Sequence, residues 1–166
     1  ARRRREEPLV HAASRALKTF RHRWLGRDKL VGIVEGIARG RPSGPIRLVD
    51  IGCSDGGLFA RLVARLPSAV AVGIEISTQL AAAANRRLRG YGGRCIHAAG
   101  VDGLRQLPAA SIHVAILSCV LEHEHELEPV PLLAGCRERL SADGRIVVKV
   151  PNYSVSPGGS AAGDGV

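Results

Sequence analysis

The stretch that decides the fold is residues 48–58, which read LVDIGCSDGGL. It continues an apolar run that begins at Ile46, and the β-branched residues of that run predict a buried strand over Ile46–Ile51. The glycines between positions 52 and 57 predict a tight turn, after which Leu58–Leu66 has the apolar spacing of a helix. A strand that passes through a glycine-rich turn into a helix is the repeating unit of a parallel α/β sheet.

On both sides of this stretch, apolar runs alternate with segments of helical spacing. Runs that are apolar along their whole length predict strands buried on both faces, so helices must cover both sides of the sheet. The further predicted strands are Ala69–Ile76, Arg94–Ala98, Ile112–Ser118 and Arg145–Val150. The further predicted helices are Leu25–Ala38, Gln79–Leu88 and Leu127–Leu140, the last of which becomes regular only from Leu132 because of Pro129 and Pro131.

Length and composition indicate a single domain. The chain has 166 residues, of which 45% are hydrophobic and 23% charged, so it can bury one core without a disulfide or a metal. We predict a basic, partly helical arm over residues 1–27, a domain over 28–152 and a flexible Gly/Ser-rich tail over 153–166. No stretch approaches the roughly 20 apolar residues of a membrane helix, and no secretory signal is recognisable, so we expect a cytoplasmic protein without membrane contact.

The positive charge is concentrated at one end. The net charge is +9, and residues 1–27 hold nine basic and two acidic residues, which leaves only +2 for the rest of the chain. Such an arm can attract phosphates, but aromatic residues make up only 3% of the chain and offer little on which bases could stack. Contact with RNA or another anionic partner through the arm is therefore the less favoured hypothesis.

Cysteine and histidine spacing does not predict a metal site. Cys53, Cys95, Cys119 and Cys136 form no CxxC pair, so free thiols in a reducing compartment are the expectation. The run Glu122–Glu126 contains two histidines two positions apart, which a helix would point toward different faces.

The glycine turn indicates which ligand it would receive. Glycines at the carboxyl end of a strand let a nucleotide-type ligand approach the backbone, but the spacing of Gly52, Gly56 and Gly57 is not the G-x-G-x-x-G of a dinucleotide site. Asp50 and Asp55 would repel a pyrophosphate, and no Gly-Lys-Ser/Thr is present for a P-loop. Two carboxylates suit a ligand that carries an amino group and a sulfonium cation.

Polar residues follow three further predicted strands. Glu75 ends the second strand, where a carboxylate can accept hydrogen bonds from both hydroxyls of a ribose. Asp102 follows the third strand and can accept from an adenine amino group. Ser118 ends the fourth strand, and Leu121-Glu122-His123 comes next. Because the carboxyl ends of parallel strands meet at one edge, these groups should line one crevice.

Taken together, the chain resembles the class I S-adenosylmethionine-dependent methyltransferases, and within them the small-molecule enzymes with a Leu-Glu-His motif after strand four. The resemblance covers roughly residues 30–152 and rests on five pieces in order, namely 49–56, 73–77, Asp102 with Leu107-Pro108, 120–123 and 140–152. It implies a Rossmann-like doubly wound parallel sheet of order 3-2-1-4-5. Because Tyr153–Val166 cannot supply two strands, we expect the family's C-terminal hairpin to be missing and strand five to be an open edge prone to self-association.

The resemblance also implies roles for individual residues. His123 would act as a general base, although it and Glu122 could instead only fix the loop. Departures from the family pattern are Ser54, where a glycine is usual, and Ile112-His113, where Phe-Asp is usual. The implied S-adenosylmethionine contacts are Asp50, Gly52, Ser54, Gly56 and Ser118 for the methionine part, Glu75 for the ribose, and Asp102 with Gly103 for the adenine, with Ile76 beside them.

The function that follows is transfer of a methyl group to a hydroxyl or amine of a small molecule. Two alternatives remain at this point. The domain could be a cofactor-binding or degenerate methyltransferase-like module that serves as a protein partner, or an RNA methyltransferase steered by the basic arm.

Overall fold

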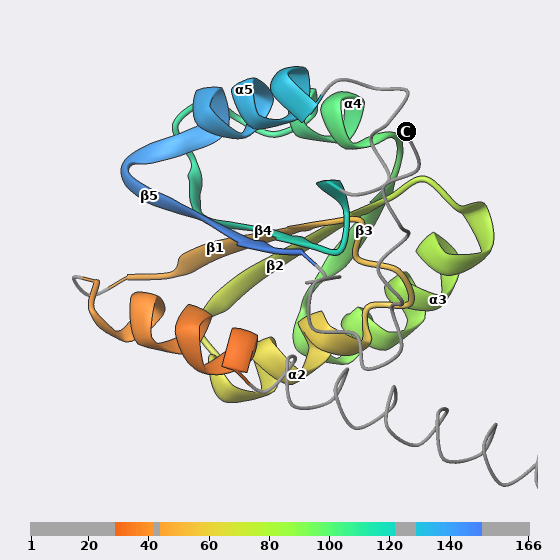
Figure 1. The fold of residues 1–166 in the computed structure, drawn as a ribbon. Helices are drawn as coiled ribbons and strands as arrows, with labels where there is room; N and C mark the ends of the chain where they lie inside the picture. Colours follow the sequence, from red (N-terminus) through yellow and green to blue (C-terminus); the bar gives the residue numbers. More distant parts are fainter. Residues whose placement is uncertain (1–28, 42–43, 122–128, 151–166) are drawn as a thin grey trace, which may run out of the picture.

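The computed structural model describes residues 29–41, 44–121 and 129–150. Its centre is one five-stranded sheet in the order β3-β2-β1-β4-β5, in which every pair of neighbours is parallel (Figure 1). This confirms the predicted doubly wound sheet and its strand order. The strands are β1 (Ile46–Ile51), β2 (Ala69–Glu75), β3 (Arg94–His97), β4 (Ile112–Ser118) and β5 (Leu140–Lys149).

Helices cover both faces of the sheet. The helix over residues 29–39 and α2 (Gly57–Arg65) lie on one face, with α3 (Thr78–Leu88) beside α2 (Figure 1). The opposite face carries α4 (Gly100–Arg105) and α5 (Pro129–Arg139), and a short 3-10 turn, η1 (Arg89–Tyr91), follows α3. Among the described residues, no helix has the length and apolar character needed to span a membrane.

The central strands are mostly apolar because each contributes to two cores. Leu48 packs into the core under α2, and its neighbour Val49 packs into the core under α4 and α5. Ile116 and Leu117 of β4 alternate in the same way. Successive side chains of a strand point to opposite faces, so a strand covered on both sides needs apolar residues on both faces.

The predicted bounds of two elements near the end of the chain need correction. The helix predicted over Leu127–Leu140 is regular already at Pro129 and not only from Leu132, because the first turn of a helix has N–H groups without helical partners and tolerates proline. β5 begins at Leu140 and not at Arg145. Leu140 pairs with Ile112, after which the register shifts before Arg145 pairs with Val114, so a bulge includes Ser141 to Gly144 in the strand.

One helix was not predicted at all. α4 has six residues, two of which are glycines, so its sequence has little helical propensity. It is stabilised by packing, since Leu104 is buried and a Cβ added to Gly103 would lie 2.5 Å from Cγ2 of Ile74 in β2. The predicted arm over 1–27 and tail over 153–166 lie outside the described residues, so the arm, the tail and the open-edge prediction for strand five stay predictions.

Candidate functional site

The site lies at the carboxyl ends of the parallel strands β1, β2 and β4. The turn after β1 has an unusual backbone, with positive φ at Gly52 (68°), Ser54 (53°) and Gly56 (73°). Residues other than glycine adopt such angles at a cost, so the strained conformation of Ser54 marks a turn whose shape the surrounding structure imposes.

Close packing fixes this turn from two sides. A Cβ added to Gly52 would lie 2.7 Å from Cγ2 of Val120, just beyond β4, and one added to Gly56 would lie 3.2 Å from the Cα of Ala84 in α3. Gly56 is also the residue immediately before α2, whose first N–H groups point toward the turn. At both positions glycine is therefore required by the close packing against neighbouring residues as well as by the backbone angle.

Glu75 joins the turn after β1 to the turn after β2. Its residue is only 7% exposed, and its Oε2 accepts a hydrogen bond from the Ser54 N–H at 2.9 Å. Its Oε1 accepts from the Ser77 N–H, also at 2.9 Å. Ser77 in turn is the N-cap of α3, with its Oγ accepting from the Leu80 N–H at 3.4 Å. The acid thus holds two strand ends in one arrangement.

Asp50 and Asp55, on either side of the start of the turn, have different surroundings. Asp50 lies inside β1 and is 2% exposed. Asp55 accepts from the Gly57 N–H at 3.0 Å, and its Oδ2 is 2.6 Å from Nη1 of Arg87 in α3. Arg87 therefore offsets the charge of Asp55, and the sequence argument that gave this carboxylate a direct role toward a cationic ligand is weakened.

The predicted adenine residues lie on α4. Asp102 is in the first turn of this helix, largely exposed, with Oδ1 2.9 Å from Nη1 of Arg105. The Gly103 N–H donates to the Ala99 carbonyl at 2.8 Å, so it is used inside the helix. Ile76 follows Glu75 directly and is 68% exposed, which leaves an apolar surface beside the buried acid.

The end of β4 contributes the other side of the site. Ser118 is half-buried at the last position of the strand. Cys119 follows with a φ of 59°, and its N–H donates to the Lys149 carbonyl of β5 at 2.8 Å. The predicted base His123 and its neighbour Glu122 lie outside the described residues. Within the described parts, no group of three or more His, Cys, Asp and Glu side chains could hold a metal ion.

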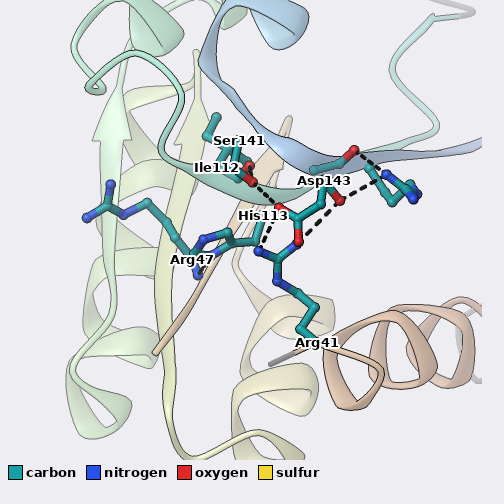
Figure 2. Close-up of polar contacts among 8 residues, drawn as sticks. Arg41, Arg47, Ile112, His113, Ser141 and Asp143 are labelled. Atoms are coloured by element: carbon teal, nitrogen blue, oxygen red, sulfur yellow. Dashed lines mark hydrogen bonds and ion pairs between the residues drawn. The ribbon is translucent and has the colours of Figure 1, made fainter. Parts of the chain in front are cut away.

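A cavity of about 440 Å³ lies at the opposite edge of the sheet, and its lining includes Arg39, Arg41, Ile46 and His113. Figure 2 shows the polar contacts beside it, where Arg41 pairs with Asp143 at 2.7 Å and Nδ1 of His113 accepts from the Arg47 N–H at 2.8 Å. Because Ile46 and His113 belong to the amino ends of β1 and β4, this cavity is separate from the predicted cofactor site.

The electrostatics of that second cluster favour a neutral histidine. Burial first, and then the positive charge of Arg41, lower the pKa of His113 below its ordinary value, against a smaller opposing effect of Asp143. The hydrogen bond from Arg41 lowers the pKa of Asp143 in turn. The cluster therefore combines a neutral imidazole acceptor with an ion pair.

Comparison with known proteins identifies the family. A model described as "Methyltransferase domain" matches residues 49–146, which is more than half of the chain. The chain belongs to the methyltransferase domain family, with the fold of the class I S-adenosylmethionine-dependent methyltransferases.

The relatives found are longer than this chain. Trans-aconitate 2-methyltransferase of Methylobacterium nodulans is 32% identical over 122 residues, which are 73% of this chain and 44% of that protein. Geranyl diphosphate C-methyltransferase of Streptomyces coelicolor has a TM-score of 0.57 at 20% identity, over 66% of this chain and 40% of that one. A SAM-dependent methyltransferase of Archaeoglobus fulgidus has a TM-score of 0.58 at 19% identity, over 76% and 54% of the two chains. The chain thus spans about half or less of their lengths.

Sequence reasoning missed several groups that shape the site. Ser77 and Arg87 were not predicted, although Ser77 supplies a hydrogen bond to Glu75 and Arg87 pairs with Asp55. Ser77 had a recognisable signal, since a serine just before an alanine-rich helix is a favoured N-cap. No sequence signal places Arg87 at the turn, because its partner is 32 positions away.

Proposed function

We propose that this domain binds S-adenosylmethionine across the carboxyl ends of β1, β2 and β4 and supports transfer of its methyl group to a hydroxyl or amine of a small molecule. The observation that carries the proposal is the carboxylate of Glu75. It is almost fully buried, and backbone N–H groups from the turns after β1 and β2 hold both of its oxygens.

The residues present fit the cofactor. Each oxygen of a carboxylate can accept more than one hydrogen bond, so Glu75 keeps acceptor capacity for the paired hydroxyls of a ribose. A carboxylate that is already fixed loses little freedom when it binds them. The exposed side chain of Ile76 offers an apolar surface for the flat adenine, and the buried charge of Asp50 favours the cationic end of the ligand.

The chain's own contribution is binding and alignment. When bound, S-adenosylmethionine supplies a methyl group on a sulfonium centre that is already reactive toward nucleophiles. Gly52 and Gly56 let the backbone turn tightly and pack against Val120 and Ala84, which fixes the shape of the turn. Holding donor and acceptor in line can supply most of the rate enhancement, so a base such as His123 is needed only for acceptors that must lose a proton.

A second candidate acceptor is a carboxylate. Its support is the relative that is 32% identical, whose name identifies trans-aconitate, a tricarboxylate, as the methyl acceptor of that protein. A carboxylate oxygen is already an anion at neutral pH and needs no base. Comparing the rates of methyl transfer to trans-aconitate and to hydroxyl and amine acceptors distinguishes the two candidates. Only the hydroxyl and amine acceptors require a proton to be removed.

Calorimetry with S-adenosylhomocysteine tests the cofactor proposal. We expect the parent chain to bind and Glu75→Ala to weaken binding by about 1 to 3 kcal/mol, the range for losing hydrogen bonds to a charged acceptor. Glu138→Gln is the matched control, since it removes an exposed carboxylate on α5 and should leave the affinity unchanged. Unchanged affinity in a folded Glu75→Ala chain would contradict the ribose role.

Turnover distinguishes an enzyme from a binding module. Methyl transfer to a member of a mixed acceptor panel supports the enzyme, whereas binding of the cofactor without transfer to any acceptor supports a module that serves as a partner of another protein. For the RNA alternative, the test is the salt dependence of RNA binding with and without residues 1–27, because phosphate contacts by the arm would make the affinity fall steeply with salt.

A further inference from the structure

Two cysteines from distant parts of the chain meet beside the turn that follows β1. The Sγ atoms of Cys53, in the turn, and Cys95, in β3, are 3.6 Å apart although 42 positions separate them. β2 lies between β1 and β3 in the sheet, and its Gly73 pairs with Cys95. A Cβ at Gly73 would lie 2.5 Å from the Cys53 Sγ, so the two sulfurs can meet only because this position has no side chain.

The surroundings of the pair fix one thiol more firmly than the other. The two cysteines are 4% and 8% exposed and form a small separate cluster with Ala81 and Ala84 of α3. Asn85 holds the backbone of Cys95 on both sides, donating to its carbonyl at 2.9 Å and accepting from its N–H at 2.8 Å. Cys53 instead belongs to the strained turn.

The two thiols also differ in acidity. The hydrogen bond between the two thiols lowers the pKa of Cys95, whereas the same hydrogen bond, together with burial, raises the pKa of Cys53. Cys95 is therefore the thiol that ionises first and the better nucleophile of the two. Cys136, by contrast, is buried below α5 on the other face of the sheet.

We propose that Cys53 and Cys95 form an oxidation site, at which a hydroperoxide converts the two thiols into a disulfide. In the first step the Cys95 sulfur attacks the outer peroxide oxygen. The O–O bond breaks, a sulfenic acid forms, and an alcohol or water leaves with the thiol proton. In the second step the Cys53 sulfur attacks the sulfenic sulfur, the S–O bond breaks, and the hydroxyl leaves as water with the Cys53 proton.

The disulfide would act on the predicted cofactor site, a consequence that rests on the proposed function. Bond formation shortens the distance between the sulfurs from 3.6 Å to about 2.05 Å. Because Asn85 anchors Cys95, most of this movement falls on Cys53 and its turn. The next residue is Ser54, whose N–H is bonded to Glu75. We expect the oxidised chain to bind S-adenosylhomocysteine about tenfold more weakly than the reduced chain, a loss of about 1.4 kcal/mol.

Peptide mapping tests the disulfide directly. The folded chain is treated with hydrogen peroxide, remaining thiols are alkylated, and the product is digested with trypsin. Before alkylation, we expect the intact mass of the treated chain to be lower by two hydrogens. After digestion, we expect a cross-link between peptides 48–61 and 95–105. Cys119 and Cys136 share the peptide 106–137 and serve as an internal control that should stay fully alkylated.

Variants and a second measurement separate the two parts of the proposal. Cys95→Ser should lose the cross-link, and Cys95→Ala provides a second variant should the first not fold, whereas Cys136→Ser should retain it. A cross-link to Cys119 or Cys136, oxygen addition to Cys53 or Cys95 without a cross-link, or unchanged thiols would each overturn the oxidation site. Equal affinity of the cross-linked and reduced chains for S-adenosylhomocysteine would overturn the effect on the turn. Absence of binding by the reduced chain would overturn the proposed function instead.

Discussion

The two ends of the parallel strands, called here the carboxyl edge and the amino edge of the sheet, are built in different ways. At the carboxyl edge the backbone takes positive φ at Gly52, Ser54 and Gly56, and a buried acid, Glu75, holds two turns together. At the amino edge there is a cavity of about 440 Å³, and the charged groups next to it pair with one another, as Arg41 does with Asp143 (Figure 2).

The comparison separates two kinds of feature, a hollow at one end of the strands and strained, buried polar groups at the other. The amino-edge cluster combines an ion pair and a neutral imidazole acceptor, which are sufficient to explain its polar residues as structural. At the carboxyl edge, strained angles and an almost fully buried carboxylate cost folding free energy. Features that cost stability and recur at adjacent strand ends are better evidence for a ligand site than volume is.

The largest expected difference between the edges is in the rate of methyl transfer, and it concerns two histidines near the two ends of β4. His113 lies at the amino end of this strand, and His123 follows its carboxyl end in the sequence. If His123 is a general base, His123→Ala should lower transfer to a hydroxyl acceptor about 100-fold or more. Cofactor affinity should change by only a few-fold, because the base acts on the acceptor. Steady-state transfer of labelled methyl groups measures the rate.

His113→Ala is the matched control, and we expect its transfer rate to equal that of the parent. An equal loss of cofactor affinity and rate in His123→Ala would instead indicate that His123 and Glu122 only fix the loop.

A smaller effect is expected for the glycine that supports the turn. Gly52 and Gly92 both have a φ of 68°, but a Cβ would meet Val120 at 2.7 Å in the first and nothing within 4 Å in the second. Gly92→Ala should therefore lose only about 1 to 2 kcal/mol of unfolding free energy, from the left-handed backbone alone. Gly52→Ala should lose at least about 1 kcal/mol more, because Val120 must move.

Urea unfolding of both variants measures this difference, and calorimetry should show weaker S-adenosylhomocysteine binding for Gly52→Ala alone. Equal destabilisation of the two variants would contradict the close packing at the turn.

Much of this arrangement could be predicted from the sequence, because long-range burial leaves a local signal. The bounds of β1 and β4 match the apolar runs that predicted them, since strands covered on both faces are mostly apolar along their length. Glu75 was predicted at the end of β2 because an acid that closes an apolar run has little reason to be there for packing. The strand order followed from the family resemblance and is confirmed by the pairing.

The features that escaped prediction depend on contacts between distant residues. α4 contains two glycines and forms because Gly103 packs against Ile74, which its own sequence does not indicate. Cys53 and Cys95 show no spacing motif, and their contact depends on the register of β2 and β3 and on the small size of Gly73. Single-sequence patterns report which face of an element is buried, but not which residue lies opposite.

Ion pairs at the two edges should differ modestly in their effect on binding. Arg87 pairs with Asp55 at 2.6 Å in the turn after β1, whereas Arg41 pairs with Asp143 at the other edge. Arg87→Gln should cost at most about 1 kcal/mol of stability, as for other exposed pairs, and should lower S-adenosylhomocysteine affinity a few-fold because the turn loosens. Arg41→Gln should leave that affinity unchanged. Calorimetry on the pair of variants decides, and equal losses would show that the two edges are coupled.

The smallest expected effect is a dependence of stability on pH at the amino edge. Burial and Arg41 lower the pKa of His113 in the folded chain, so the unfolded chain binds a proton more readily near its ordinary pKa of about 6.5. Where the unfolded state binds more protons, stability rises with pH, so this contribution is complete above that value and is lost as pH falls through it toward the lower folded pKa. Protonation would also remove Nδ1 as the acceptor of the Arg47 N–H.

His113→Asn has no titrating group here, so its unfolding free energy in urea should fall less than that of the parent between neutral and mildly acidic pH. All other histidines are shared by the two chains, so identical pH profiles would show that His113 titrates alike in the folded and unfolded states.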